Sequence, residues 1–140
     1  PATVANMVCG FDVLGFAVNE PYDIMQLTLV NEPGITIHNK DNYNLPTDPD
    51  KNVAGAALQA LMEELTIPVG FDLTITKQIK PGSGVGSSAA SSAGAVAAAN
   101  YLLGNIFSQE DLVRFAMNGE KLASGVKHAD NIAPCIFGGV

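Results

Sequence analysis

The sequence has 140 residues with 47% apolar content, which is enough for one domain with a buried core and too little for two ordinary domains. Seven basic residues against fourteen acidic ones give a net charge of −7. That balance disfavours nucleic acid and anionic membrane surfaces, because binding to a phosphate backbone depends on Lys and Arg. We therefore expect no nucleic-acid partner and no membrane association.

The first predicted elements are two strands. Residues 23–30 and 35–38 are rich in β-branched and apolar side chains and flank the sequence Asn31-Glu32-Pro33-Gly34. Two such segments around a Pro-Gly turn predict a β-hairpin.

A loop, a helix and a third strand follow. Residues 39–50 are polar and turn-forming, which predicts a surface loop. Residues 52–65 place apolar side chains at spacings of three and four, which predicts an amphipathic helix with Asp50 as a possible cap. Residues 71–79 begin with alternating apolar and polar side chains, which predicts a half-buried strand.

The second half of the chain is predicted to be mostly helical. Residues 87–103 are small residues and strong helix formers, and residues 108–122 begin with Ser108 and Asp111 in nearly the spacing of a capping box. The apolar, glycine-rich end at residues 137–140 predicts a strand or a turn. The pattern indicates a mixed α and β fold but does not determine the topology.

The cysteines and several lysines are expected to have no special role. Cys9 and Cys135 lie far apart and lack zinc-site spacing, so we expect free, buried thiols in a reducing cytoplasm. Lys40, Lys77 and Lys127 are expected to be solvated. The chain starts without Met and ends on apolar residues, so we expect both ends to be truncations.

Gly82, Gly84 and Gly86 lie between the third predicted strand and the following helix. Glycines let backbone amides point inward, and a helix N-terminus adds unpaired N–H groups with a partial positive charge, so such a loop can hold a polyphosphate. The alternative is a tight connection in which the serines only cap the helix. A Walker A loop is excluded because no Lys follows the last glycine, and a dinucleotide fingerprint because Ser87 stands three residues after Gly84.

Residues 81–90, PGSGVGSSAA, resemble the phosphate-binding motif of the GHMP kinases, which ends in G-[LV]-G-S-S-A-A. Three other segments are similar to the homoserine kinases within that family. Residues 1–15 resemble their motif P-A-[ST]-x-A-N-x-G-x-G-[FY]-D-x-[LF]-G, with Val8 in place of the first motif glycine. Residues 51–53 resemble a segment near the nucleotide base. Residues 119–139 resemble the homoserine kinase signature, in which H-x-D-N is followed by an apolar strand ending in two glycines.

The resemblance implies a fold and a domain organisation. The fold would be the α+β fold of the GHMP kinase N-terminal domain, which is similar to ribosomal protein S5 domain 2 and has a left-handed β-α-β crossover. Residues 1–140 would form this ATP-binding domain without the family's C-terminal domain, so the isolated fragment would be inactive.

The resemblance also implies a reaction, the ATP-dependent phosphorylation of the side-chain hydroxyl of L-homoserine in threonine biosynthesis. The enzyme would be cytoplasmic and could form a homodimer. The alternatives are another GHMP kinase, acting on mevalonate or a sugar, and a catalytically silent GHMP-like module that binds nucleotide.

Individual residues acquire roles from the same resemblance. Mg²⁺ would be held by Ser88 and Glu120 together with ATP phosphate oxygens. ATP and its phosphates would contact Asn52, Pro81, Gly82, Ser83, Gly84, Val85, Gly86, Ser87 and Ser88. L-Homoserine would contact Asn6, Asp12, His128, Asp130 and Asn131.

The implied catalytic residues are Ser88, Glu120 and Asn131. Mevalonate-kinase-like members use an aspartate as base in the equivalent segment. Counting back from Gly138 places Asn131 at that position, whereas counting from the Asp-Asn dipeptide places Asp130 there. The resemblance to homoserine kinases favours Asn131 and a mechanism without a protein base, since an amide cannot accept a proton at neutral pH. Asn131 would then orient the hydroxyl, and phosphate oxygens would assist proton loss.

Overall fold

The computed structural model describes residues 1–7 and 10–139, apart from the side chains of Met7, Phe11 and Asp12. The described elements are β1 (Thr3–Met7), β2 (Gly10–Ala17), β3 (Ile24–Val30), β4 (Gly34–Asn39), α1 (Val53–Met62), β5 (Gly70–Thr76), α2 (Ser87–Leu102), α3 (Gln109–Ser124) and α4 (Ile132–Phe137). The predicted mixture of α and β structure is confirmed.

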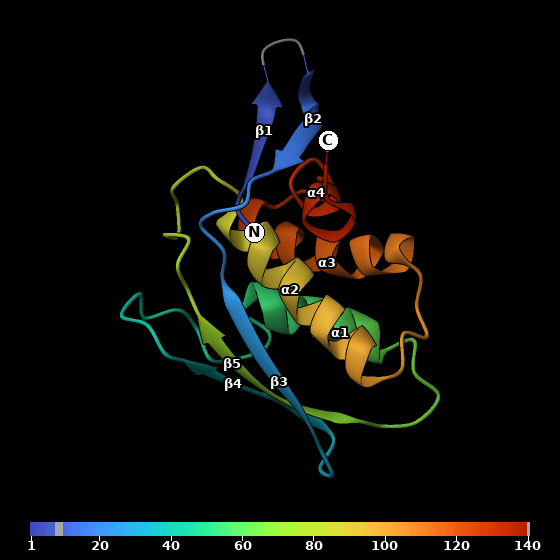
Figure 1. The fold of residues 1–140 in the computed structure, drawn as a ribbon. Coiled ribbons are helices and arrows are strands. Elements are labelled where there is room, and N and C mark those ends of the chain that lie inside the picture. Colours follow the sequence, from blue (N-terminus) through green and yellow to red (C-terminus); the bar gives the residue numbers. More distant parts are fainter. Residues whose placement is uncertain (8–9, 140) are drawn as a thin grey trace.

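The elements form two sheets and a layer of helices (Figure 1). β1 and β2 pair antiparallel as a hairpin, and the second sheet has the strand order β3-β5-β4. α1, α2 and α3 pack against one another beside this second sheet, and α4 lies next to β2. β4, α1 and β5 make a β-α-β unit with parallel strands. The handedness of its crossover stays a prediction from the family resemblance.

The predicted hairpin between residues 23–30 and 35–38 is wrong. β3 and β4 form at these places, but β5 lies between them, antiparallel to β3 and parallel to β4. As the central strand, β5 has the most buried side chains of the three strands. Gly70 lets the connection between β3 and β4 pass closely over β5, since a Cβ there would lie 1.9 Å from the Glu32 carbonyl oxygen.

The predicted helices form, with one correction at an N-terminus. α1 is capped by Asn52 rather than Asp50, because the Asn52 Oδ1 accepts from two first-turn amides at 2.9 and 3.4 Å. α3 has the predicted capping box, in which Ser108 and Asp111 each bond the other's backbone amide. Residues 87–103 form α2 almost as predicted.

The two ends of the chain differ from the prediction. Residues 132–137 form the short helix α4, although the segment ahead of the final glycines was expected to be a strand. Pro134 lies in the first turn of α4, where its missing N–H would have no partner in any case. β1 and β2 form in the N-terminal segment, for which the sequence pattern predicted no strands.

α2 is the central helix and positions the site. It packs against α1, α3, α4 and β3, and its buried residues are mostly Ala and Ser. Small side chains let the neighbouring helices approach closely: a Cβ on Gly119 of α3 would lie 2.1 Å from Ser92 Oγ and 2.3 Å from the Val53 carbonyl oxygen. The close packing brings the last turns of α3 beside the first turns of α2.

Candidate functional site

A cavity of about 540 Å³ lies at the N-terminus of α2. β1, the start of α1, the glycine loop, α2, α3 and the residue before α4 all contribute to its wall. The lining residues are Asn6, Leu45, Val53, Lys77, Pro81, Gly82, Gly84, Gly86, Ser87, Ser88, Ser91, Glu120, Ala123, Ser124 and Asn131. Segments that are far apart in the sequence therefore face one space.

The glycine loop has a backbone conformation that favours glycine. Gly82, Gly84 and Gly86 have φ angles of +74°, +78° and +68°, in the left-handed region that residues with a Cβ rarely adopt. Gly86 is the N-cap of α2, and no side chain in the described part of the chain caps this helix end. The serines therefore do not cap this helix end with their side chains, and the first-turn amides meet the condition for binding an anion.

Ser88 and Glu120 meet at the wall of the cavity. Ser88 Oγ, in the first turn of α2, donates to Glu120 Oε2, near the end of α3, at 2.9 Å. Hydroxyl and carboxylate oxygens are the kind of ligand that Mg²⁺ prefers. Among the described residues, no group of three or more His, Cys, Asp or Glu side chains could hold a metal ion. The pair could supply two oxygen ligands to a magnesium ion, and phosphate oxygens and water would have to supply the others.

Asn131 lies beside the glycine loop. Its Oδ1 accepts a hydrogen bond from Thr3 Oγ1 at 2.7 Å, and its backbone amide donates to Asp130 Oδ1 at 3.0 Å. The approach to the loop is close, since a Cβ on Gly86 would lie 3.0 Å from Asn131 Oδ1. Asn131 lines the cavity, whereas Asp130 lines a second cavity of about 570 Å³ between β2 and α4.

Several of the predicted site residues lie elsewhere. The Asn52 side chain caps α1 and donates to the Pro46 carbonyl oxygen at 2.7 Å. The side chain of Asp12 falls outside the described residues, although its backbone belongs to β2. Within the described part of the chain, the residues that line the cavity at the N-terminus of α2 do not include Ser83, Val85 or His128.

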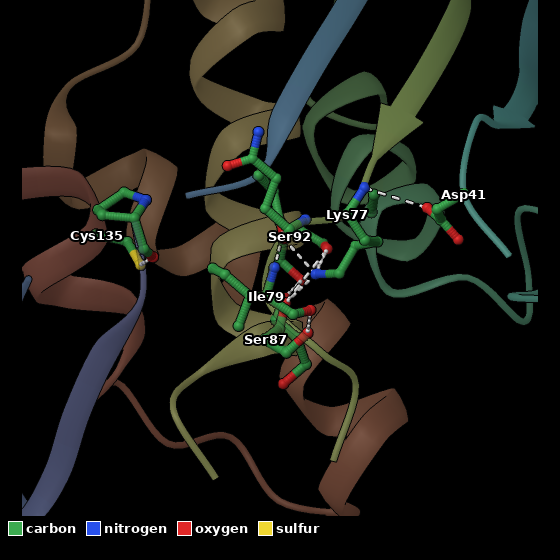
Figure 2. A network of polar contacts seen from close by, with 12 residues as sticks. Asp41, Lys77, Ile79, Ser87, Ser92 and Cys135 are labelled. Atoms are coloured by element: carbon green, nitrogen blue, oxygen red, sulfur yellow. Dashed lines mark hydrogen bonds and ion pairs between the residues drawn. The ribbon is translucent and has the colours of Figure 1, made fainter. Parts of the chain in front are cut away.

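Lys77 is a residue of the site that the sequence interpretation missed. The prediction that it is solvated is wrong, because its side chain is 1% exposed and forms an ion pair with the equally buried Asp23. Its ammonium group also donates to the Ser87 carbonyl oxygen and to Ser91 Oγ, each at 2.9 Å. Figure 2 shows Lys77 pointing toward Ser87. Burial lowers the pKa of Lys77, and the ion pair with Asp23 opposes that shift.

Asp23 also fixes the segment that leads into the glycine loop. Its Oδ1 accepts from the amides of Gln78 and Ile79, both at 2.9 Å. One carboxylate thus holds the lysine and the backbone that follows it. The alternation of buried and less buried residues along β5 could have predicted the burial of Lys77. Continued by one residue past the end of β5, it places position 77 on the same inward face as the buried apolar residues.

The remaining expectations concern reactivity and membranes. Cys135 is free and partly buried, and burial raises the pKa of its thiol; Cys9 lies outside the described residues. Lys40 and Lys127 are exposed, as predicted. In residues 1–7 and 10–139, no helix is both long and apolar enough to span a membrane.

Two curated relatives that match the chain are named homoserine kinase. The one from Methanococcus vannielii is 43% identical over 141 residues, covering 99% of this chain and 47% of that protein. The one from Chlorobium phaeobacteroides is 46% identical over 149 residues, covering 98% of this chain and 47% of that protein. The chain therefore spans about half the length of the curated relatives it matches.

Solved structures have the same fold. The crystal structure of homoserine kinase from Cytophaga hutchinsonii matches with a TM-score of 0.92 and 49% identity, covering 99% of this chain and 45% of that chain. A mevalonate kinase matches with a TM-score of 0.76 at 17% identity, covering 98% of this chain and 50% of that chain, a likeness that shows the fold alone. Residues 52–139 match the N-terminal domain of the GHMP kinases, and the predicted α+β fold of that domain is confirmed. The chain belongs to the GHMP kinase family.

Proposed function

We propose that the protein carrying this chain transfers the γ-phosphoryl group of ATP to the side-chain hydroxyl of L-homoserine, which yields O-phospho-L-homoserine and ADP. The observation that carries the proposal is the cavity at the N-terminus of α2, where the glycine loop, Ser88, Glu120 and Asn131 come together. The shared name of relatives at 43–49% identity supports homoserine as the acceptor.

The chain would supply only part of the complete site. Because the relatives are about twice as long, we propose that a C-terminal domain completes the grip on homoserine. Residues 1–140 alone would bind ATP weakly and would hardly phosphorylate homoserine. A cytoplasmic location and a homodimer are proposed on the family resemblance alone.

The glycine loop is the proposed site of the ATP phosphates. Backbone amides of residues 84–88 would donate to phosphate oxygens at the positive end of α2. The buried ammonium group of Lys77 lies under the same helix turn, bonded to the Ser87 carbonyl oxygen. Phosphoryl transfer spreads negative charge over the transferred oxygens, so fixed backbone donors would stabilise its transition state. Lys77, whose charge is paired with Asp23, would hold this helix turn in place.

Ser88 Oγ and Glu120 Oε2 are the proposed protein ligands of Mg²⁺. Their hydrogen bond at 2.9 Å already holds the two oxygens together at the wall of the cavity. A bound Mg²⁺ would neutralise negative charge on the phosphate oxygens. The protein's part is to fix the position of these oxygens relative to the glycine loop.

Glu120→Gln is expected to weaken binding of MgATP about tenfold or more, because an interaction with a charged group is typically worth about 1.5–3 kcal/mol. Calorimetric titration of the intact protein with ATP in excess Mg²⁺, and again with EDTA, measures the effect. Glu110→Gln is the matched control, since it makes the same charge change at an exposed position of α3. Equal affinity of the wild type and Glu120→Gln for MgATP would contradict the assignment.

Asn131 and Asn6 line the cavity and are proposed to contact homoserine. Asp12, whose side chain falls outside the described residues, and His128 and Asp130, which are not among the described residues that line the cavity, are proposed as contacts on the family resemblance alone. A carboxylate such as that of Asp12 suits the substrate ammonium group. The Asn131 amide cannot take a proton at neutral pH. It would orient the substrate hydroxyl, whose proton would pass to a phosphate oxygen as the phosphoryl group is transferred.

ADP release by the intact protein should be selective for L-homoserine when L-threonine, mevalonate and galactose are offered in parallel. A coupled assay with saturating MgATP measures the four rates under identical conditions. Selective turnover of mevalonate or galactose would identify a different GHMP kinase. Silence with all four acceptors, while MgATP still binds, would point to a nucleotide-binding module without catalysis.

A further inference from the structure

Thr3 joins three segments that form the wall of the cavity. Its side chain is fully buried, with 0% exposure. Its backbone amide donates to the Val85 carbonyl oxygen of the glycine loop at 3.1 Å. Its hydroxyl donates to Asn131 Oδ1 at 2.7 Å, and a Cβ on Gly86 would lie 2.0 Å from that hydroxyl oxygen. Thr3 therefore fills the space between the glycine loop and the start of α4.

The bond from Thr3 determines which end of the Asn131 carboxamide is free. An asparagine side chain has one acceptor oxygen and two N–H donors. In this structure the oxygen is engaged by Thr3, and the backbone of Asn131 is held by Asp130 Oδ1. The NH₂ group is then the end that Asn131 can offer to the cavity it lines.

We propose that Thr3 is a positioning residue: its hydroxyl locks the Asn131 carboxamide so that the NH₂ group, and not the carbonyl oxygen, is presented to the reacting groups. The idea extends the proposed phosphoryl transfer and rests on it for its catalytic consequence. Phosphate oxygens need donors as their negative charge develops, and a carbonyl oxygen at the same place would repel them. Thr3 itself touches no reacting atom.

Thr3→Val tests the proposal because it removes the hydroxyl and keeps a similar shape, whereas Thr3→Ser keeps the hydroxyl. In intact protein labelled with ¹⁵N-asparagine, the side-chain NH₂ signals of Asn131 are identified by their loss in Asn131→Asp. We expect Thr3→Val to move or average these signals and Thr3→Ser to leave them nearly in place.

Steady-state kinetics with homoserine give the second readout. Thr3→Val should lower kcat about tenfold or more, in line with misplacing a single transition-state donor, while KM for ATP changes little. Thr3→Ser should restore most of the lost kcat. A merely structural role would instead change the affinity for ATP along with turnover, because Thr3 also holds the glycine loop through its backbone.

Unaltered Asn131 signals or an unaltered kcat in Thr3→Val would overturn the proposal. Thr3→Ala serves the same comparison if Thr3→Val does not fold. The experiment distinguishes failure of this proposal from failure of the proposed function. If the wild type phosphorylates none of the four acceptors, homoserine kinase activity is disproved. The NMR comparison alone then decides whether Thr3 orients the Asn131 carboxamide.

Discussion

Gly86→Ala is expected to abolish measurable ATP binding and to destabilise the fold. Gly86 has a φ of +68°, and placing a residue with a Cβ in that region costs about 1–2 kcal/mol. The added methyl would also lie 2.0 Å from Thr3 Oγ1, and the Thr3 residue is fully buried. Overpacking of this kind typically costs about 1–3 kcal/mol more, and the loop can relieve it only by moving its amides away from the phosphate site.

Calorimetric titration with MgATP and urea unfolding of the intact protein measure the two effects separately. Gly104→Ala is the matched control for backbone strain, because Gly104 has a φ of +84°. A Cβ added at Gly104 would have no atom of the described residues within 4 Å beyond its chain neighbours. Gly104 also follows the C-terminal end of α2, far from the cavity at the N-terminus of that helix. We expect the control to lose about 1–2 kcal/mol of stability and to keep its ATP affinity. If Gly86→Ala bound MgATP as the control does, the shape of the glycine loop would not depend on Gly86.

The sequence predicted those parts of the fold that depend on local interactions. The capping box at Ser108 and Asp111 needs only residues three positions apart, and it forms as expected. The small-residue helix after the glycine loop also forms, because Ala, the best helix former, recurs through residues 87–102 and no Pro interrupts the segment. Such signals lie within a few residues of one another and do not require the tertiary structure.

The errors in the fold come from pairings between distant segments. The turn sequence before Gly34 favoured a hairpin, but β5, more than thirty residues further along, pairs with both strands and separates them. The short apolar run before Gly138 was equally ambiguous, because a few apolar residues fit a strand or a buried helix turn. In the structure this segment forms the helix α4, which packs against α2 and α3.

In the candidate site too, residues within a sequence motif were predictable, whereas a residue that depends on a distant partner was not. The family resemblance predicts the glycine loop, Ser88 and Glu120 as site residues, and the structure brings them to one cavity with Asn131. Lys77 was missed although the period of β5 places it inward, because a lysine is normally solvated and its partner Asp23 lies 54 positions away. Burying a charged side chain is stable only when the fold places an opposite charge beside it, and no local sequence pattern predicts such a distant partner.

Lys77→Met is expected to lower the free energy of unfolding by about 3–5 kcal/mol, because it leaves the Asp23 carboxylate buried without its ion-pair partner. Urea unfolding of the intact protein measures the loss. Lys40→Met is the control, since Lys40 is exposed, and a surface change of this kind usually stays within about 0.5 kcal/mol.

Combining Lys77→Met with Asp23→Asn should recover part of the stability, because Asn can still accept from the amides of Gln78 and Ile79 without a buried charge. A double variant no more stable than Lys77→Met would exclude the stranded carboxylate as the cause.

The pH dependence of stability gives an independent check on the same lysine. Burial lowers the pKa of Lys77 from its ordinary value of 10.5, so between the two values the unfolded chain holds more protons than the folded one. Stability contributed by this group therefore rises with pH through that window and reaches its lowest level below the folded-state pKa. The wild type should show this rise relative to Lys77→Met when unfolding is measured at increasing alkaline pH. Parallel curves for the two proteins would mean that the ion pair with Asp23 fully offsets the effect of burial.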